Sequence, residues 1–238
     1  MSPIVKHIPN TITSMNLLCG VLGILCSFEG QFPLAFCFML GAAVCDFCDG
    51  LSARLLKAYS PIGKELDSLA DVVTFGVAPS TMLFFTMKTV DYPAFLEQFR
   101  CLLPYTAFIM AAFSALRLAK FNLDERQALG FIGMPTPANA LFWGSVTVAY
   151  QGYLGASAYS VLILTVLMLL FSWLLISEIP MFALKFKHWG IDNSENVIKY
   201  SFLVFSAAAI IIAKIAAIAV IIIMYIIVSV LVFRKKTH

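Results

Sequence analysis

The sequence predicts an all-α polytopic membrane protein, a helical bundle of about eight transmembrane helices with a short N-terminal interfacial segment. Three observations support this prediction. Of the 238 residues, 61% are hydrophobic and 12% are charged, and the mean hydropathy is +0.92, far outside the balance of a soluble domain. Apolar runs long enough to cross a hydrocarbon core of about 30 Å recur along the chain. The Lys and Arg side chains gather on one side of the topology that these runs define.

The first element is the interfacial segment. Residues 1–10 carry Pro3 and Pro9 among amphipathic positions, so we expect this segment to end at Asn10 and Thr11, which can cap a helix. The apolar run that follows lacks a small-residue cleavage site, and we expect the N-terminus to be retained.

Six apolar runs predict transmembrane helices at roughly 12–28, 34–57, 64–87, 102–120, 138–153 and 157–177. Turn residues at 29–33 separate the first two runs, and Ser60, Pro61 and Gly63 break the chain between the second and third. The segment 178–199 is rich in charge, so it is expected to lie outside the hydrocarbon.

The last apolar run covers 200–233. As one helix its 34 residues would extend about 51 Å, too long for a single ordinary span. Lys214 divides the run, which predicts a helical hairpin with Lys214 at its turn and eight spans in all. Seven spans are the alternative.

The charges favour eight spans with both termini in the cytoplasm. This topology places thirteen cations on the cytoplasmic side: Lys6, Arg54, Lys57, Lys64, Arg117, Lys120, Arg126, Lys185, Lys187, Lys199, Arg234, Lys235 and Lys236. Three cations fall on the other side: Lys88, Arg100 and Lys214. Seven spans would put the C-terminal Arg-Lys-Lys tail on the wrong side.

Four aspartates interrupt this apolar sequence: Asp46, Asp49, Asp67 and Asp71. The first two are spaced i, i+3 and the last two i, i+4, so each pair lies on one face of its helix, and the helix break lets the faces meet. Each ionised Asp in a membrane costs roughly 2.5 to 3.5 kcal/mol, so a divalent cation is the natural neutraliser. Oxygen ligands favour Mg²⁺, Mn²⁺ or Ca²⁺. Simple pairing with Arg54, Lys57 and Lys64 would leave a carboxylate unmatched.

Small residues accompany the acids. Gly50, Ala53 and Gly63 remove side-chain bulk where a ligand can approach the backbone, although helix packing explains each of them as well. Arg54 is a natural partner for a diphosphate.

Together these residues read Asp, two residues, Asp-Gly, two, Ala-Arg, eight, Gly, three, Asp, three, Asp. The pattern resembles the signature of the CDP-alcohol phosphotransferase family of membrane enzymes, and a chance match is on the order of 10⁻⁹ per starting point. The resemblance implies one membrane domain over 1–238, with a catalytic core at about 8–178 and a C-terminal hairpin at about 200–233. It implies an enzyme in which a CDP-linked donor loses CMP while its phosphoryl group passes to an alcohol, and homodimers are common in this family.

The resemblance also implies roles for single residues. Asp46, Asp49 and Asp67 would bind Mg²⁺ or Mn²⁺, with Ca²⁺ as an occupant that does not support turnover, and Asp71 would lie near the metal and act as general base. One further set would line the nucleotide and diphosphate site: Asp49, Gly50, Ala53, Arg54 and Gly63.

Further motifs resemble the bacterial and archaeal members that transfer the phosphatidyl group of CDP-diacylglycerol to L-serine, enzymes of the cytoplasmic membrane whose active site meets its cytoplasmic face and the membrane lipids. They are IPNTITSMN at 8–16, SLADVVTFGVAP at 68–79, RLAKFN at 117–122, FIGMPTPA at 131–138 and, more loosely, SEIPMFALK at 177–185. The serine carboxylate needs a fixed cation, for which we propose Arg117, with Lys57 and Lys120 as alternatives and Asn122 and Thr136 nearby. The positive-inside tendency accounts equally well for the three cations.

Other functions are weighed against this one. A different acceptor, as in phosphatidylglycerophosphate synthases, is the alternative within the family. Intramembrane carboxylates also mark divalent-cation transporters, although these acids cluster at one side of the membrane rather than through its depth. A structural scaffold would not need the acids at all. The net charge of +3 suggests no nucleic-acid partner.

Overall fold

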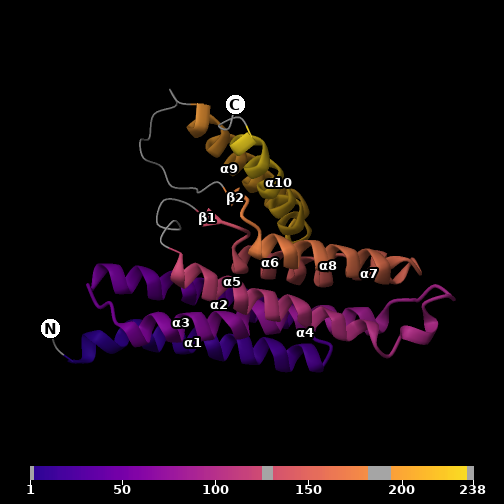
Figure 1. Ribbon diagram of the computed structural model, residues 1–238, viewed down its shortest axis with the longest axis horizontal. Helices are drawn as coiled ribbons and strands as arrows, with labels where there is room; N and C mark the ends of the chain where they lie inside the picture. The colour runs from indigo at the N-terminus through magenta and orange to yellow at the C-terminus, as the bar shows by residue number, and fades with distance from the viewer. Residues whose placement is uncertain (1–2, 125–130, 182–193, 235–238) are drawn as a thin grey trace.

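The computed structural model describes residues 3–124, 131–181 and 194–234, and almost all of them are helical (Figure 1). The elements in chain order are α1 (Pro3–Phe28), α2 (Phe32–Leu55), α3 (Pro61–Asp71), the π-helix η1 (Val72–Val77), α4 (Ala78–Thr89), the 3₁₀ turns η2 (Glu97–Phe99) and η3 (Leu103–Phe108), α5 (Ile109–Leu123), β1 (Phe131–Ile132), α6 (Thr136–Ala149), α7 (Gln151–Gly155), α8 (Ser160–Ile176), β2 (Pro180–Met181), α9 (Ser194–Ala213) and α10 (Ile215–Arg234).

Each predicted apolar run is helical, and the protein is a polytopic membrane protein. Five described helical segments are long and apolar enough to cross a membrane: His7–Phe28, Phe32–Leu55, Pro61–Thr89, Leu103–Leu123 and Asn196–Ala213. Two further apolar helices, Ser160–Ile176 and Ile215–Leu231, are shorter, and α6 has 14 residues. The count of eight crossings stays a prediction. The predicted surface segment 178–199 lies largely outside the described residues.

The prediction that a separate segment ends at Asn10 is wrong, because α1 runs unbroken from Pro3 with Pro9 inside it. Proline removes one N–H from the helical ladder, but the turns that follow are supported by side chains. The Thr13 hydroxyl donates to the Pro9 carbonyl at 3.0 Å, and the Thr11 hydroxyl donates to the carbonyl four residues earlier at 2.9 Å. Asn10 is therefore a helical residue that can present its side chain to a neighbouring helix.

The turn between α2 and α3 differs by a few residues from its predicted place. The chain turns at 56–60, where Lys57 adopts a left-handed φ of 50°, and α3 begins at Pro61 rather than near Lys64. Proline suits the first helical position because its missing N–H would have no partner there. The Ser60 hydroxyl caps the helix by accepting from the Gly63 N–H at 3.0 Å.

A π-helix joins α3 to α4. It begins directly after Asp71, and the Ala78 N–H donates to the Val73 carbonyl five residues back. The two faces of this turn meet different helices: the Thr74 hydroxyl donates to the Asn16 carbonyl of α1, whereas Gly76 packs against Ser114 of α5. Such wide turns are frequent at functional sites.

The predicted C-terminal hairpin is present. Lys214 interrupts the helix with a left-handed φ of 48°, and α9 and α10 contact each other on either side of it. Figure 1 shows this pair at an angle to α1–α5, which run along the long axis of the molecule. The hairpin is tied to the rest through α10, which contacts α6 and β2.

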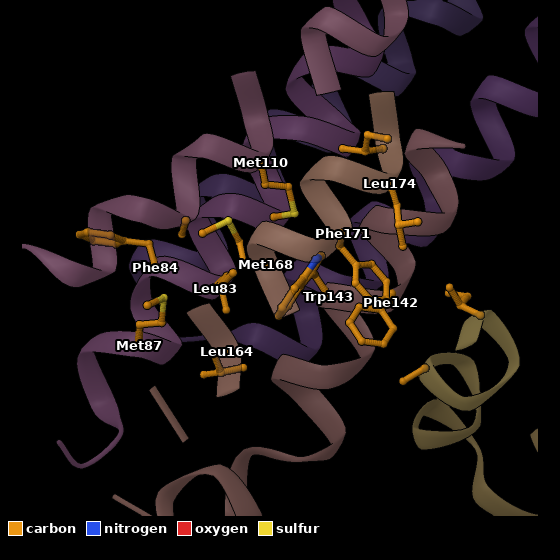
Figure 2. Close-up of a cluster of buried hydrophobic side chains, with 14 of the residues drawn as sticks. Leu83, Phe84, Met87, Met110, Phe142, Trp143, Leu164, Met168, Phe171 and Leu174 are labelled. Carbon is orange, nitrogen blue, oxygen red and sulfur yellow. The ribbon is translucent and has the colours of Figure 1, made fainter. Parts of the chain in front are cut away.

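The main hydrophobic core lies between α4, α5, α6 and α8. Phe142 stacks on Phe171 of α8, Trp143 meets the same ring edge-on, and Met110 and Met168 lie beside them (Figure 2). A short antiparallel pair of strands, β1 and β2, closes the loops at the end of this core. Among the residues that the structure describes, these two-residue strands are the exception to the all-α prediction.

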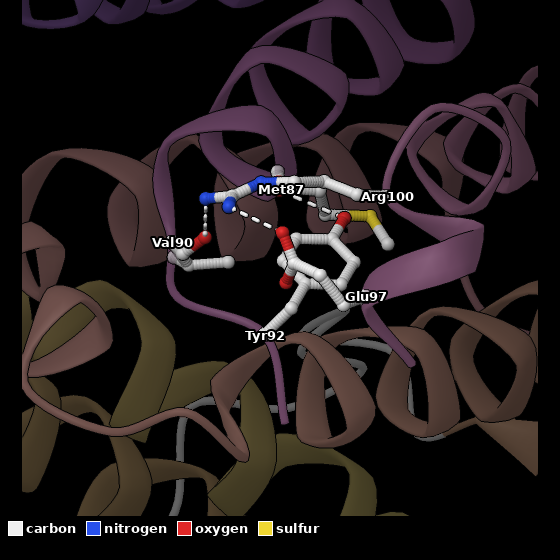
Figure 3. Close-up of polar contacts among 5 residues, drawn as sticks. All are labelled: Met87, Val90, Tyr92, Glu97 and Arg100. Atoms are coloured by element: carbon white, nitrogen blue, oxygen red, sulfur yellow. Dashed lines mark hydrogen bonds and ion pairs between the residues drawn. The ribbon is translucent and has the colours of Figure 1, made fainter. Parts of the chain in front are cut away.

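The connection between α4 and α5 is held by polar contacts at the end of the bundle opposite the N-terminus (Figures 1 and 3). Burial raises the pKa of Tyr92, so its phenol stays protonated and donates to the Met87 carbonyl at 3.0 Å. Arg100 pairs with Glu97 at 2.9 Å and donates to the Val90 carbonyl at 3.4 Å. This exposed pair orders the loop and contributes little to stability.

Replacing Gly144 by alanine is expected to destabilise the protein. A methyl group there would overlap the Phe36 ring, which is fully buried. Alanine gains about 0.5 to 1 kcal/mol in a helix, but overpacking costs about 1 to 3 kcal/mol, so the clash dominates. Thermal denaturation in detergent should show a lower midpoint for Gly144→Ala. Gly152→Ala is the control, because nothing lies within 4 Å of the added methyl group. An unchanged midpoint for Gly144→Ala would show that α2 and α6 are not in this contact.

Candidate active site

Three of the four aspartates form one cluster. Asp46 and Asp49 come from α2 and Asp67 comes from α3, and one carboxylate oxygen of each lies within 4.8 Å of the others. The i, i+3 spacing puts the first two on one face of α2, and the turn at 56–60 brings α3 back against them. Asp49 is 5% exposed, and the other two are half-buried.

The donor set of this cluster fits a divalent metal ion. Asp49 Oδ2 and Asp67 Oδ1 are buried and have no hydrogen-bond partner among the described residues. Unpaired buried carboxylate oxygens are costly unless a cation compensates them. All donors in the cluster are oxygen atoms, the ligands that Mg²⁺, Mn²⁺ and Ca²⁺ prefer. The cluster can therefore hold a hard divalent cation.

Asp71 lies beside this cluster rather than within it. Its Oδ1 accepts a hydrogen bond of 3.1 Å from the Asn16 amide of α1. Asn16 is itself held in place, because Thr74 donates to its backbone carbonyl at 3.2 Å and packs closely on Gly20. The carboxylate still interacts electrostatically with the three clustered acids, Asp46 among them. It is thus a fixed, 7% exposed carboxylate next to a potential metal site.

A cavity of about 500 Å³ opens next to the acidic cluster. Its walls are the first turns of α1, the last turns of α2 and the start of α3. All five positions predicted for the nucleotide and diphosphate line it: Asp49, Gly50, Ala53, Arg54 and Gly63. Lys64 and Asp67 line it too, so the cavity has cations near a site for a metal. A side chain at Gly63 would meet Asn10 Oδ1 at 2.9 Å, which explains the need for glycine there.

A buried cation lies on the α5 side of Asp71. Arg117 is 7% exposed, donates to the Thr136 hydroxyl at 3.4 Å and stacks over Phe121 at 4.8 Å. Its guanidinium interacts electrostatically with Asp71 and Asp46, while its Nε has no hydrogen-bond partner among the described residues. The structure therefore brings together two of the residues predicted for the acceptor, Arg117 and Thr136, next to the acids.

The other three residues predicted for the acceptor lie elsewhere. Lys120 pairs with Glu178 at 3.2 Å on the exposed surface. The Asn122 amide donates to the Ser68 hydroxyl of α3 at 2.7 Å, and its backbone carbonyl accepts from Lys64 at 3.1 Å. Lys57 is in the turn after α2, where its left-handed backbone conformation helps to reverse the chain.

The prediction missed the contribution of α1. Asn10 and Thr13 line the cavity, and Asn16 holds Asp71. These polar residues recur at i, i+3 and i+6, which places them on one face of an otherwise apolar helix. That spacing was the available signal, but Pro9 suggested that the helix began only after Asn10.

The arrangement can do specific chemistry. A metal site beside a cavity with Arg54 and Lys64 suits a diphosphate, whose charge such groups offset. Asp71 is a fixed carboxylate that can take a proton, and Arg117 is a buried cation that can bind an anionic group.

Comparison with known proteins identifies the family. The family model described as CDP-alcohol phosphatidyltransferase matches residues 6–234, nearly the whole chain. The chain therefore belongs to the CDP-alcohol phosphatidyltransferase family.

Three relatives share one name, CDP-diacylglycerol–serine O-phosphatidyltransferase. The protein from Bacillus subtilis (strain 168) is 35% identical over 193 residues, covering 81% of this chain and 96% of the relative. The Methanocaldococcus jannaschii protein is 33% identical over 156 residues, covering 66% of this chain and 68% of the relative. The Helicobacter pylori (strain J99) protein is 36% identical over 135 residues, covering 56% of this chain and 54% of the relative. The chain thus spans about half of this last protein.

Proposed function

We propose that this protein transfers the phosphatidyl group of CDP-diacylglycerol to the hydroxyl of L-serine, with release of CMP. One observation carries the proposal: carboxylate oxygens of Asp46, Asp49 and Asp67 lie within 4.8 Å of one another at a cavity lined by Arg54, and Asp71, fixed by the Asn16 amide, follows one helical turn after Asp67. A carboxylate that can activate a hydroxyl thus lies close to the proposed diphosphate site, and the buried cation Arg117 would bind an anionic acceptor. The shared name of the three relatives supports serine as that acceptor.

The proposed reaction is a direct displacement. The serine oxygen forms a bond to the phosphorus that carries the diacylglycerol, and the bond from that phosphorus to the CMP oxygen breaks. Asp71 takes the hydroxyl proton, and the negative charge leaves with CMP. A divalent ion, Mg²⁺ or Mn²⁺, held by Asp46, Asp49 and Asp67 would offset charge on the diphosphate oxygens.

The chain's own residues position both substrates. Arg54, which lines the cavity, would bind the diphosphate, and Gly50 and Gly63 leave room for the nucleotide to approach the backbone. Arg117 would bind the serine carboxylate, since a guanidinium can bind it with two parallel hydrogen bonds. Thr136 keeps Arg117 in place from α6.

The proposal includes a location and an assembly. The enzyme would be an integral protein of a bacterial or archaeal cytoplasmic membrane, one domain over 1–238, with its active site near the cytoplasmic face and both termini in the cytoplasm. The charge asymmetry of thirteen cations against three supports this orientation. The apolar helices would contact membrane lipids, and the active form would be a homodimer.

An acceptor panel tests the function. Purified protein with CDP-diacylglycerol and Mn²⁺ or Mg²⁺ is expected to release CMP with L-serine. The rate should be at least about tenfold above that with glycerol 3-phosphate or an inositol compound, because a site built to bind the charged groups of one acceptor rejects acceptors that leave its own polar groups unpaired. CMP release that depends on one of those acceptors and not on serine would overturn the substrate assignment. Metal uptake into proteoliposomes without CMP release would favour a transporter instead.

A further inference from the structure

Several polar atoms inside the bundle are unpaired and have no part in the proposed reaction. Asn139 of α6 is fully buried, and neither its Nδ2 nor its Oδ1 has a hydrogen-bond partner among the described residues. The Ser114 hydroxyl of α5 is buried and unpaired in the same way. A buried amide with both functions unsatisfied is strongly unfavourable, so a native structure that keeps one usually holds a polar ligand or water beside it.

Helix geometry places Asn139 in line with the proposed acceptor site. Thr136 and Asn139 are spaced i, i+3 near the start of α6, and Ser114 and Arg117 are spaced i, i+3 near the end of α5. The hydrogen bond from Arg117 to Thr136 joins these two faces at the site. Asn139 and Ser114 each lie one helical turn further into the bundle.

Deeper in the bundle the surroundings of both helices become apolar. Met110, one turn before Ser114, belongs to the same buried cluster as Trp143, one turn after Asn139 (Figure 2). Along each helix, the unpaired polar side chain of Ser114 or Asn139 therefore lies between the Arg117–Thr136 pair and a member of this apolar cluster.

We propose that the acceptor subsite extends inward from Arg117 and Thr136 to Asn139, and that Asn139 Oδ1 accepts a hydrogen bond from the ammonium group of an amino-acid acceptor. This inference rests on the proposed function. An amino acid with a hydroxyl group carries a carboxylate, which the Arg117 guanidinium suits, and an ammonium, which needs a neutral oxygen acceptor away from that guanidinium. The Asn139 carbonyl is such an acceptor, buried and without another partner.

Asn139→Leu is the informative variant, because leucine has the same branched shape and the same number of side-chain heavy atoms but no polar atom. The Michaelis constant for serine should rise about tenfold to a hundredfold, the range expected for a lost hydrogen bond to a charged group, while kcat stays within about threefold. Thermal stability should be equal or higher, since an unpaired buried amide is removed. Asn139→Ala should raise the Michaelis constant in the same way and guards against a specific effect of leucine.

Two fragments of serine separate this role from a structural one. Ethanolamine keeps the ammonium and lacks the carboxylate, whereas 3-hydroxypropionate keeps the carboxylate and lacks the ammonium. As inhibitors against serine, ethanolamine should weaken in Asn139→Leu by the same factor as serine, and 3-hydroxypropionate should not. Ser145→Ala on the same helix is the control, because that hydroxyl bonds to the Phe142 carbonyl of its own helix.

The outcomes are distinct. If the wild-type protein releases CMP with serine but Asn139→Leu keeps its Michaelis constant, the inference is wrong and Asn139 holds only water. Equal weakening of both fragments would also overturn it, since the effect would then be structural. If the wild-type protein does not use serine at all, the proposed function fails first, and the inference fails with it.

Discussion

Asp71→Asn is expected to reduce turnover by about 10³-fold or more, because general-base catalysis contributes about 10² to 10⁴-fold and an amide cannot take the acceptor proton. The fold should be kept. The Asn16 amide donates to Asp71 Oδ1 at 3.1 Å, and the carbonyl oxygen of an asparagine can accept the same hydrogen bond. Serine-dependent CMP release in detergent measures the effect, with the thermal midpoint recorded on the same preparation.

Asp91→Asn is the matched control for this change. Asp91 is exposed in the connection between α4 and η2, at the end of the bundle far from the acids. The Asp91→Asn variant should retain full turnover and an unchanged thermal midpoint. If Asp71→Asn keeps more than about a tenth of the wild-type rate, another group removes the proton, and the role proposed for Asp71 is wrong.

Asp49→Asn is expected to separate metal binding from folding. Asp49 is 5% exposed with an unpaired Oδ2, so in the absence of metal its charge opposes those of Asp46 and Asp67. Neutralising it should raise the thermal midpoint of the metal-free protein. It should also weaken Mn²⁺ binding at least about tenfold and lower turnover at least about a hundredfold, because a charged ligand is lost.

Mn²⁺ binding can be followed directly by electron paramagnetic resonance, which does not depend on turnover. Glu65→Gln is the control: it removes one negative charge from the exposed side of α3, two residues before Asp67. It should leave Mn²⁺ affinity and turnover unchanged. Unchanged Mn²⁺ affinity in Asp49→Asn would show that Asp49 is not a metal ligand and that the metal binds elsewhere.

The helices could be predicted from hydropathy because each apolar run must satisfy its backbone internally in a membrane. Lys214 even marked the break between α9 and α10. The ends of the helices were harder to predict. Pro9 suggested a boundary, yet the local hydrogen bonds of Thr13 and its neighbours keep α1 helical through it. Pro61, by contrast, does start a helix, because Ser60 caps it.

The predictions about the active site were likewise successful in part. Spacing within one segment tells which residues share a face, and this was enough to predict that Asp46, Asp49 and Asp67 meet. It does not tell which neighbouring helix that face touches. Lys120 and Arg117 are three residues apart, but Arg117 points into the bundle and Lys120 pairs with Glu178 at the surface. That choice depends on how α5 is rotated against α6 and α8, which no single segment encodes.

The π-helix at Val72–Val77 makes the number of residues in this stretch as important as their identity. Residues before it, in α3, pack against α1, and residues after it, in α4, pack against α1, α6 and the η3 turn. One residue advances an α-helix by about 100°, so a deletion between Asp71 and Ala78 would turn the carboxylates by about that angle away from the cavity. Among natural variants of this chain, the length of this stretch should therefore stay constant.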